Sequence, residues 1–279
     1  MAPIVTREQK YEALRALHER AGIFVIPNPW DAGSAKILTA LGFEALATTS
    51  SGYAFSSGRI DSSDVLTRDD VLANAKSIVE ATHLPVSADL QDGFGPSPGM
   101  CAETIRLAAE SGLAGGSIED AGNDPDNPIY EFQHAVERVT AAAKAAHDCR
   151  FLLTARAENF LHGRIDLADT IRRLQAFSDA GADVLYAPGL TSLDEIWQVC
   201  TAVSKPVNVL MGMKGVGYSV EELAAAGVKR ISVGGSFERA GLGAFVRAAL
   251  EVKNKGTFTY AADAITHAEV TQYMLNDRR

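Results

Sequence analysis

The chain has 279 residues, of which 47% are hydrophobic and 22% charged, a composition typical of a globular protein and not of a disordered one. The formal net charge of −9 offers no electrostatic basis for binding nucleic acid or an anionic membrane. Three widely spaced cysteines, Cys101, Cys149 and Cys200, predict neither a disulfide framework nor a zinc cluster. The first 20 residues are charged and no apolar run reaches membrane-spanning length, so we expect a cytoplasmic protein.

Short apolar, β-rich runs alternate with amphipathic helical stretches along the chain. A helix at residues 6–21 is expected to precede the first strand. Eight strands are predicted at residues 23–26, 45–48, 86–89, 116–119, 150–155, 184–187, 207–211 and 230–233. The helices between them are predicted at residues 31–41, 68–81, 102–110, 131–146, 167–179, 193–203 and 220–225. An eighth helix is expected at residues 236–254, and residues 260–276 follow with weaker periodicity.

Four joints between a predicted helix and the next strand contain a glycine, at Gly42, Gly112, Gly181 and Gly227. Glycine just past a helix adopts the left-handed conformation without a steric penalty, so the repeated joint indicates stacked βα units. Eight strands without a dinucleotide-binding fingerprint favour a closed barrel over an open parallel sheet. We therefore predict an α/β fold, a (β/α)8 TIM barrel, built as a single domain over residues 1–279.

Charged side chains follow three neighbouring predicted strands, at the ends where barrel enzymes place their catalytic groups. Asp89 and Glu119 end the third and fourth strands, and Arg156 ends the fifth. Carboxylates that converge on one mouth repel each other unless a cation lies between them, and oxygen ligands suit Mg²⁺. A lone Asp in such a turn is more often a helix N-cap than a ligand, and Asp31, Asp92 and Asp120 could all be caps. The alternative for Arg156 is that it is only an internal ion-pair partner.

Two further strand ends carry candidate ligand-binding groups. Ser51, Gly52 and Tyr53 follow the second strand in what the sequence predicts to be a turn, where glycine would let backbone N–H groups approach a substrate oxygen. A plain turn explains the same residues. Asn208 in the seventh strand is a candidate substrate ligand, and His162 beyond the fifth strand is either a substrate contact or an ordinary loop residue.

Five motifs of the chain together resemble the isocitrate lyase/phosphoenolpyruvate mutase superfamily, over residues 22–245. They are Trp-Asp-Ala-Gly-Ser-Ala (residues 30–35), Thr-Ser-Ser-Gly-Tyr (49–53), Ala-Asp-Leu-Gln-Asp-Gly-Phe-Gly (88–95), Ser-Ile-Glu-Asp (117–120) and Thr-Ala-Arg-Ala-Glu (154–158). The resemblance implies a metal-dependent enzyme that uses Mg²⁺, or alternatively Mn²⁺, and forms an enolpyruvate-like intermediate. It also implies a homodimer or homotetramer in which neighbouring subunits exchange the last helix.

The resemblance implies a role for several residues. Asp89 and Glu119 would hold the metal, Glu119 through water, and Asp61 matches a mobile-loop aspartate near it. Arg156 would bind the substrate carboxylate. The segment Ser51, Gly52 and Tyr53 matches one that grips the carboxylate and carbonyl oxygens of the substrate.

Departures from the family pattern bear on the reaction. The Lys-Lys/Arg-Cys-Gly-His loop of the lyases is replaced by Ala-Gly-Asn-Asp-Pro-Asp-Asn-Pro at residues 121–128, which contains no cysteine acid. The mutase histidine falls at Pro188, and a second metal-motif carboxylate falls at the neutral Gln91. These departures predict a reaction that needs only a modest proton donor, such as water, Tyr53 or Glu158.

The predicted function is cleavage of a carbon–carbon bond, or decarboxylation, in a small 2-oxo or 2-hydroxy acid resembling oxaloacetate. One alternative is a phosphonopyruvate-type mutase or hydrolase. Another is a phosphate-handling barrel, because Gly234-Gly235-Ser236 opens a helix after the eighth strand. A non-catalytic protein that binds a 2-oxo acid is the third alternative.

Overall fold

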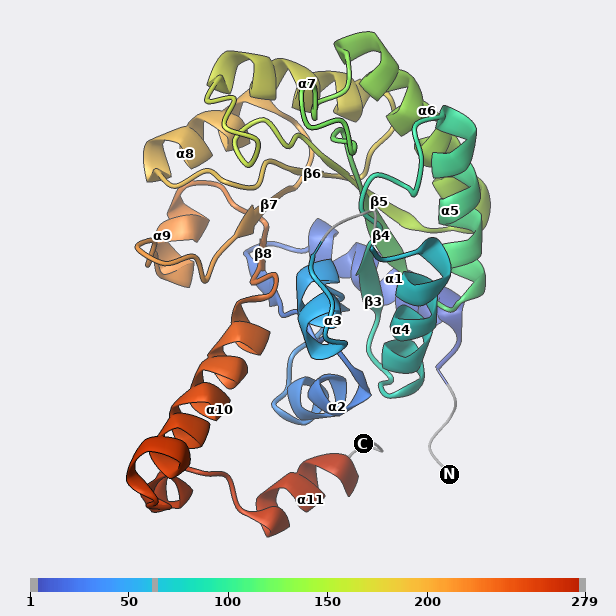
Figure 1. Cartoon of the computed structure of the whole chain (residues 1–279). Coiled ribbons are helices and arrows are strands. Elements are labelled where there is room, and N and C mark those ends of the chain that lie inside the picture. Colours follow the sequence, from blue (N-terminus) through green and yellow to red (C-terminus); the bar gives the residue numbers. More distant parts are fainter. Residues whose placement is uncertain (1–4, 62–64, 276–279) are drawn as a thin grey trace.

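A computed structural model describes residues 5–61 and 65–275 of the chain. Within them, eight parallel strands form one sheet in the order β1-β8-β7-β6-β5-β4-β3-β2, with helices around it (Figure 1). The strands are β1 (Phe24–Ile26), β2 (Leu46–Ala47), β3 (Val86–Asp89), β4 (Gly115–Glu119), β5 (Leu152–Arg156), β6 (Val184–Tyr186), β7 (Val207–Leu210) and β8 (Arg230–Ser232). Between β2 and β1, the backbone N–H of Ala47 donates to the carbonyl of Pro27 at 3.0 Å. The sheet is therefore a nearly closed barrel, which confirms the predicted (β/α)8 fold.

The helices follow the predicted order, with one addition. They are α1 (Arg7–Glu19), α2 (Ala32–Ala40), α3 (Ser50–Ser56), α4 (Arg68–Glu80), α5 (Pro98–Glu110), α6 (Phe132–Cys149), α7 (Leu167–Asp179), α8 (Leu193–Ala202) and α9 (Val220–Ala225). Helix α5 begins before its predicted start because the Ser97 side chain caps it and Pro98 occupies its first position. Asp31 caps α2 through the N–H of Ser34 at 2.7 Å, so the N-cap interpretation of this aspartate is confirmed.

The segment predicted as a turn after the second strand is instead the first turn of helix α3, and this prediction was wrong. The Thr49 side chain caps the helix by accepting from the N–H of Gly52 at 3.3 Å. A Cβ at Gly52 would lie 2.7 Å from Cγ2 of Thr49 and 3.1 Å from Cβ of Trp30. Glycine is therefore needed here so that α3 can pack closely against Trp30.

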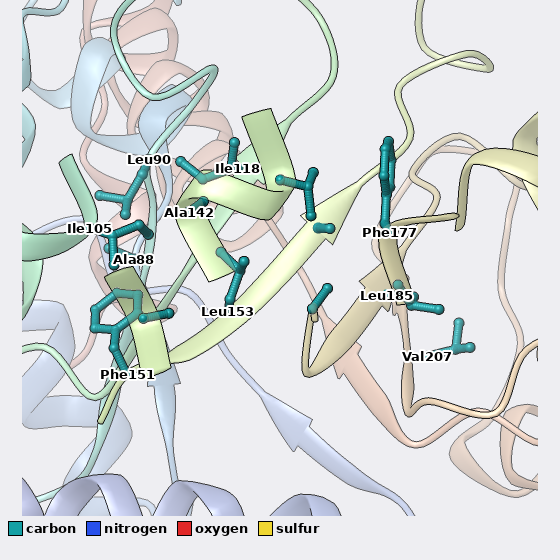
Figure 2. Packing of buried hydrophobic residues seen from close by; sticks show 14 of the residues in the cluster. Ala88, Leu90, Ile105, Ile118, Ala142, Phe151, Leu153, Phe177, Leu185 and Val207 are labelled. Carbon is teal, nitrogen blue, oxygen red and sulfur yellow. The ribbon is translucent and has the colours of Figure 1, made fainter. Parts of the chain in front are cut away.

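The main hydrophobic core lies between the sheet and the helices that surround it. Figure 2 shows Leu90, Ile118 and Leu153 from the strand side of this core near Ile105 of α5 and Ala142 of α6. The predicted left-handed joints are confirmed, because φ is 87°, 95°, 104° and 88° at Gly42, Gly112, Gly181 and Gly227. These joints return the chain from helix to strand so that consecutive strand ends meet at one mouth of the barrel.

The C-terminal region forms an arm that leaves the barrel (Figure 1). It comprises α10 (Ser236–Lys255), the 3-10 helix η1 (Thr259–Ala262) and α11 (His267–Leu275). Helix α10 matches the expected eighth helix in length, but its large apolar side chains are exposed, with Phe245 at 68%, Val246 at 50% and Leu250 at 48%. Helix α11 lies beside α2, where Nζ of Lys36 donates to the carbonyl of Met274 at 3.4 Å.

Among the described helices, none combines the length and the apolar character that crossing a membrane requires.

Candidate active site

The ends of β3, β4 and β5 open into a cavity of about 340 Å³ at the mouth of the barrel. The parallel register places Asp89, Glu119 and Arg156 at the ends of these three neighbouring strands. The cavity is lined by Ser50, Asp61, Asp89, Gln91, Asp92, Glu119, Ala121, Gly122, Asn123, Arg156, Glu158, Leu161 and His162. Side chains that were predicted to share one site from their strand-end positions therefore do lie together.

Arg156 lies at the centre of a cluster of three carboxylates. Its Nη1 is 3.0 Å from Oδ1 of Asp89 and 3.1 Å from Oε1 of Glu119, and its Nε donates to Oε1 of Glu158 at 2.7 Å. Within the described residues, the Nη2 group has no hydrogen-bond partner. The guanidinium therefore keeps two N–H donors for a ligand after it has bound all three acids.

The cluster carries an excess of negative charge in a poorly solvated place. The side chains of Arg156 and Glu158 are only 12% and 2% exposed. Burial raises the pKa of Glu119 well above its ordinary value, and the neighbouring Glu158 and Asp89 raise it further against the opposing effect of Arg156. For Arg156, burial alone would lower the pKa, but the three carboxylates raise it above its ordinary value. One arginine thus faces three acids, and a further cation would relieve their repulsion.

Asp61 belongs to this site, as its match to the family's loop aspartate predicted it would. It lines the cavity together with Ser50. Partial burial and the charge of Asp89 raise the pKa of Asp61. His162 also lines the cavity, so it is placed to contact a ligand.

The residues of the segment predicted to bind the substrate oxygens, Ser51 to Tyr53, do not all lie beside the acidic cluster. The backbone N–H of Ser50, at the start of α3, donates to Oδ2 of Asp89 at 3.3 Å. The Ser51 hydroxyl lies 3.1 Å from that of Thr49. The Tyr53 ring packs against a small apolar cluster that includes Leu66, and it is not among the residues that line the cavity. Only the start of α3 therefore adjoins the acidic cluster directly.

Asn208 lies deeper in the barrel than the cavity at the mouth. It is 1% exposed, its Nδ2 donates to Oγ of Ser232 at 2.9 Å, and its Oδ1 accepts from Nε of Arg230 at 2.8 Å. A second cavity of about 70 Å³ there is bounded by Asn208, Ser232, Arg230 and Tyr186, and by Asp89 and Arg156 above them. Both polar ends of the Asn208 amide are thus held by protein groups.

Tyr186 was not identified from the sequence. It ends β6 inside the barrel, and its ring centroid lies 5.1 Å from Cζ of Arg156. Burial raises the pKa of its hydroxyl to about 12. The sequence feature that could have identified it is a tyrosine, with its polar hydroxyl, at the end of the apolar strand Val184–Tyr186. Alternate side chains of a barrel strand point into the barrel interior.

The oxygen donors at the mouth fit a hard divalent cation. Oxygens of Asp89 and Glu119 converge on the same arginine nitrogen, and the buried Oε1 of Gln91 has no hydrogen-bond partner in the described residues. Among the residues that the structure describes, no group of three or more acidic, histidine or cysteine side chains is close enough together to hold one metal ion. Two carboxylates completed by water and substrate oxygens are the ligand pattern that Mg²⁺ prefers. The Asp92 side chain instead accepts a hydrogen bond from the backbone N–H of Phe94 at 2.9 Å.

The loop at residues 121–128, which replaces the lyase loop, is held close to the strand end. Ala121 pairs with Ile129 in an antiparallel bridge, and the N–H of Gly122 donates to the carbonyl of Pro128 at 2.7 Å. Its members beside the cavity are Ala121, Gly122 and Asn123. The loop therefore brings an amide side chain, and no thiol, to the mouth.

A model of the phosphoenolpyruvate phosphomutase family matches residues 14–253. The 2-methylisocitrate lyase of Escherichia coli K12 is 30% identical over 202 residues, which cover 70% of this chain and 68% of that enzyme.

Solved structures agree with the sequence comparisons. A protein of Burkholderia cenocepacia J2315, described as a candidate lyase or mutase, is 56% identical, covers 96% of each chain and superposes with a TM-score of 0.94. The structure of oxaloacetate acetylhydrolase with its product oxalate is 25% identical, covers 95% of this chain and 93% of that chain, and has a TM-score of 0.85.

Proposed function

We propose a function for this protein on the premise that the chain belongs to the phosphoenolpyruvate phosphomutase family, in the superfamily that its motifs predicted. Enzymes of this superfamily act on small carboxylic acids, and its lyases include relatives of this chain, so the prediction of a carbon–carbon lyase is confirmed at the level of the family. The specific proposal is a Mg²⁺-dependent enzyme that cleaves a carbon–carbon bond, or decarboxylates, a 2-oxo or 2-hydroxy acid resembling oxaloacetate.

The observation that carries this proposal is the cluster of one arginine and three carboxylates in a cavity at the strand ends. A site that only stabilised the fold would gain little from surplus buried charge, because each unpaired ion costs several kcal/mol to desolvate. The two N–H groups of Nη2 in Arg156 remain free to donate charge-assisted hydrogen bonds to a substrate carboxylate. The surplus acids suit a metal ion beside that carboxylate.

In the proposed site, Asp89 and Glu119 would hold the metal, Glu119 through water, with the Gln91 amide oxygen beside them. Mg²⁺ bound there would supply positive charge to the carbonyl oxygen of the substrate, where negative charge develops as the bond breaks. Arg156 fixes the substrate carboxylate. Its hydrogen bond with Glu158 orients the guanidinium plane.

The chain's own groups also limit which bond can break. Glu158 and Asp61 lie at the cavity and can accept or return a proton, directly or through water. Positioned acid catalysis contributes about 10²–10⁴-fold, so a site without a dedicated thiol acid favours bonds that break readily once the enolate is stabilised. A β-oxo acid offers such a bond, whereas a tertiary alcohol such as methylisocitrate requires more help from an acid.

The phosphonopyruvate-type reaction is kept as a second candidate because the matching family model is that of a phosphomutase. Turnover of oxaloacetate, dimethylmalate, methylisocitrate and phosphonopyruvate, each with Mg²⁺ and with EDTA, separates the two. We expect the fastest Mg²⁺-dependent turnover with oxaloacetate. Efficient cleavage of methylisocitrate would contradict the proposed route without a thiol acid, and turnover of phosphonopyruvate alone would favour the second candidate.

We further propose that the C-terminal arm packs on a second copy of the chain, in a homodimer or homotetramer. The exposed apolar residues of α10 and of the segment after it support this proposal, because contiguous apolar surface is rare on monomers. Phe245→Asp should shift the sedimentation coefficient toward that of a monomer. The matched control Trp197→Asp, at an exposed aromatic of α8, should leave it unchanged, and a monomeric wild-type protein would contradict the proposal.

A further inference from the structure

A second and larger cavity adjoins the one at the mouth of the barrel. It has a volume of about 650 Å³ and lies between the start of α4 and the loops that follow β3 and β4. Asp92, Gly122 and Asn123 line both cavities, so the two lie side by side. A volume of about 300–1,000 Å³ is typical of small-molecule sites. The proposed metal ligands and Arg156 line the cavity at the mouth but not the larger one, so the proposed chemistry leaves the larger cavity without a role.

Arg68, the first residue of α4, brings a positive charge to this larger cavity. Its Nε is buried and has no hydrogen-bond partner within residues 5–61 and 65–275. Asp70 in the same turn is already engaged, because its Oδ2 pairs with Arg59 at 2.9 Å and accepts from the Thr67 hydroxyl at 2.8 Å. Asp69, also at the cavity, is exposed to solvent. A buried donor without an acceptor is unfavourable, so a ligand oxygen that accepts from Arg68 would satisfy it.

The other two acids that line the larger cavity are held by donors of their own loops or of the next element. Asp92 accepts from the N–H of Phe94 at 2.9 Å through Oδ1 and from the Tyr130 hydroxyl at 3.4 Å through Oδ2. Asp124 accepts from two backbone N–H groups of its own loop, at 3.0 Å and 3.3 Å. Neither carboxylate supplies the acceptor that Arg68 lacks, so the arginine remains available to an anionic ligand.

Apolar side chains form another part of the wall of the larger cavity. Leu66, Phe94, Pro96 and Met100 line it, and Phe94 packs against the small apolar cluster that contains the buried Leu66. Such a surface stabilises methylene groups, whereas a guanidinium stabilises an anion. The combination therefore suits a hydrocarbon chain that ends in a carboxylate.

We propose that the larger cavity binds the far end of the substrate, with apolar groups of a side chain against Phe94 and Met100 and a terminal carboxylate on Arg68. The inference rests on the proposed function and narrows its substrate class to a 2-oxo or 2-hydroxy acid with an extended side chain that ends in an acid. The reacting end stays at Arg156, and the side chain passes Gly122 into the larger cavity. Oxaloacetate corresponds to the reacting end alone and occupies only the cavity at the mouth.

N-substituted oxamates test this assignment by calorimetric titration in Mg²⁺. They keep the adjacent carboxylate and carbonyl of a 2-oxo acid, and their nitrogen carries a chain with an increasing number of methylene groups. Each chain is made with a terminal carboxylate and, as the neutral isostere, with a terminal primary amide. At the length that reaches Arg68, the carboxylate should bind the wild-type protein about tenfold more tightly than the amide, because a charge-assisted hydrogen bond forms. No such advantage at any chain length would overturn the proposal.

Two variants locate the carboxylate. Arg68→Met should abolish the advantage of the terminal carboxylate and leave the Kd of oxalate unchanged, because oxalate occupies only the cavity at the mouth. The matched control Arg106→Met removes an arginine of α5 that pairs with Glu103 and does not line the larger cavity, so it should keep the advantage. An advantage that survives in Arg68→Met would also overturn the proposal. Absence of oxalate binding to the wild-type protein would contradict the proposed function itself, whereas oxalate binding without a carboxylate advantage would reject only the extended substrate.

Discussion

Two arginine-centred clusters lie side by side in this barrel and differ in charge balance. Arg156 bonds to three carboxylates and borders the cavity at the mouth. Arg173 of α7 bonds to Asp120 at 3.1 Å and to Asp169 at 2.7 Å, and Asp169 also bonds to Arg172. The second cluster thus pairs two arginines with two acids and lies behind the strand ends.

Charge balance distinguishes the structural ion cluster around Arg173 from the candidate site around Arg156. The N–H of Glu158 donates to Asp120 at 2.8 Å, so the balanced cluster anchors the strand end that carries the unbalanced one. Balanced charges can satisfy each other and exclude solvent. Surplus carboxylates around Arg156 have no such internal compensation, and they border a cavity that a ligand can enter.

Removing the arginine of the balanced cluster should have the largest effect, and it should act on stability. Arg173→Met leaves Asp120 buried without its ion-pair partner, which typically costs about 3–5 kcal/mol. Urea unfolding should show this loss, while kcat of the folded protein changes little. The control is Arg172→Met, whose side chain is 60% exposed and should cost less than about 1 kcal/mol. A normal stability with lost activity in Arg173→Met would reverse the two assignments.

In the unbalanced cluster, Asp89→Ala should act on activity. Loss of metal-borne charge stabilisation is worth several kcal/mol, or roughly a thousandfold in kcat/KM. Thermal stability should change little or even rise, because the surplus charge decreases. Glu119→Gln should be milder, since this residue is proposed to act through water. Activity of Asp89→Ala close to wild type, measured in excess Mg²⁺, would remove Asp89 from the metal site.

The next effect concerns the substrate carboxylate. Arg156→Lys keeps one positive charge but loses the planar fork, which typically costs about 1.5–3 kcal/mol, or roughly ten- to a hundredfold in KM. Steady-state kinetics should therefore show a raised KM in a folded enzyme. If KM is unaffected, Arg156 is only an ion-pair partner, the other interpretation that the sequence left open.

The smallest effect is a pH dependence in the balanced cluster. Partial burial would raise the pKa of Asp169, but hydrogen bonds from Arg173, Asn159 and Arg172 prevail and lower it from 3.8 to about 2. Its contribution to stability is therefore complete above its unfolded pKa and is lost as the pH falls through about 2. The stability difference between wild type and Asp169→Asn should be constant near neutral pH and shrink below about pH 4. A difference that persists at pH 2 would contradict the ion-pair origin.

The sequence predicted those parts of the site that depend on local pattern. Apolar runs ending in a charged residue located Asp89, Glu119 and Arg156, because strand ends of a parallel barrel must converge. The surroundings of Asn208 were not predictable in this way, since the bond between Arg230 and Asn208 joins residues on neighbouring strands and depends on the register of β7 and β8. Helix α3 was missed because serine and glycine are typical of turns, and the capping bond of Thr49 decided otherwise.

The C-terminal arm marks a second limit of sequence reasoning. The length of α10 was predicted because its periodicity is local. The surface against which α10 packs is not determined by local sequence, and the helix leaves the barrel with Phe245 and Leu250 exposed. Periodicity identifies an apolar face but does not identify which surface covers it.

Calorimetric titration of oxalate into the wild-type protein, in Mg²⁺ and again in EDTA, tests the proposed metal site and the carboxylate-binding role of Arg156 in one experiment. Oxalate presents two carboxylates in the arrangement of a planar enolate, so it can bind a metal ion and Arg156 at once. We predict tight binding in Mg²⁺, strong weakening in EDTA, and recovery when Mg²⁺ is restored. Equal affinity in EDTA and in Mg²⁺ would contradict the assignment of Asp89 and Glu119 as a metal site.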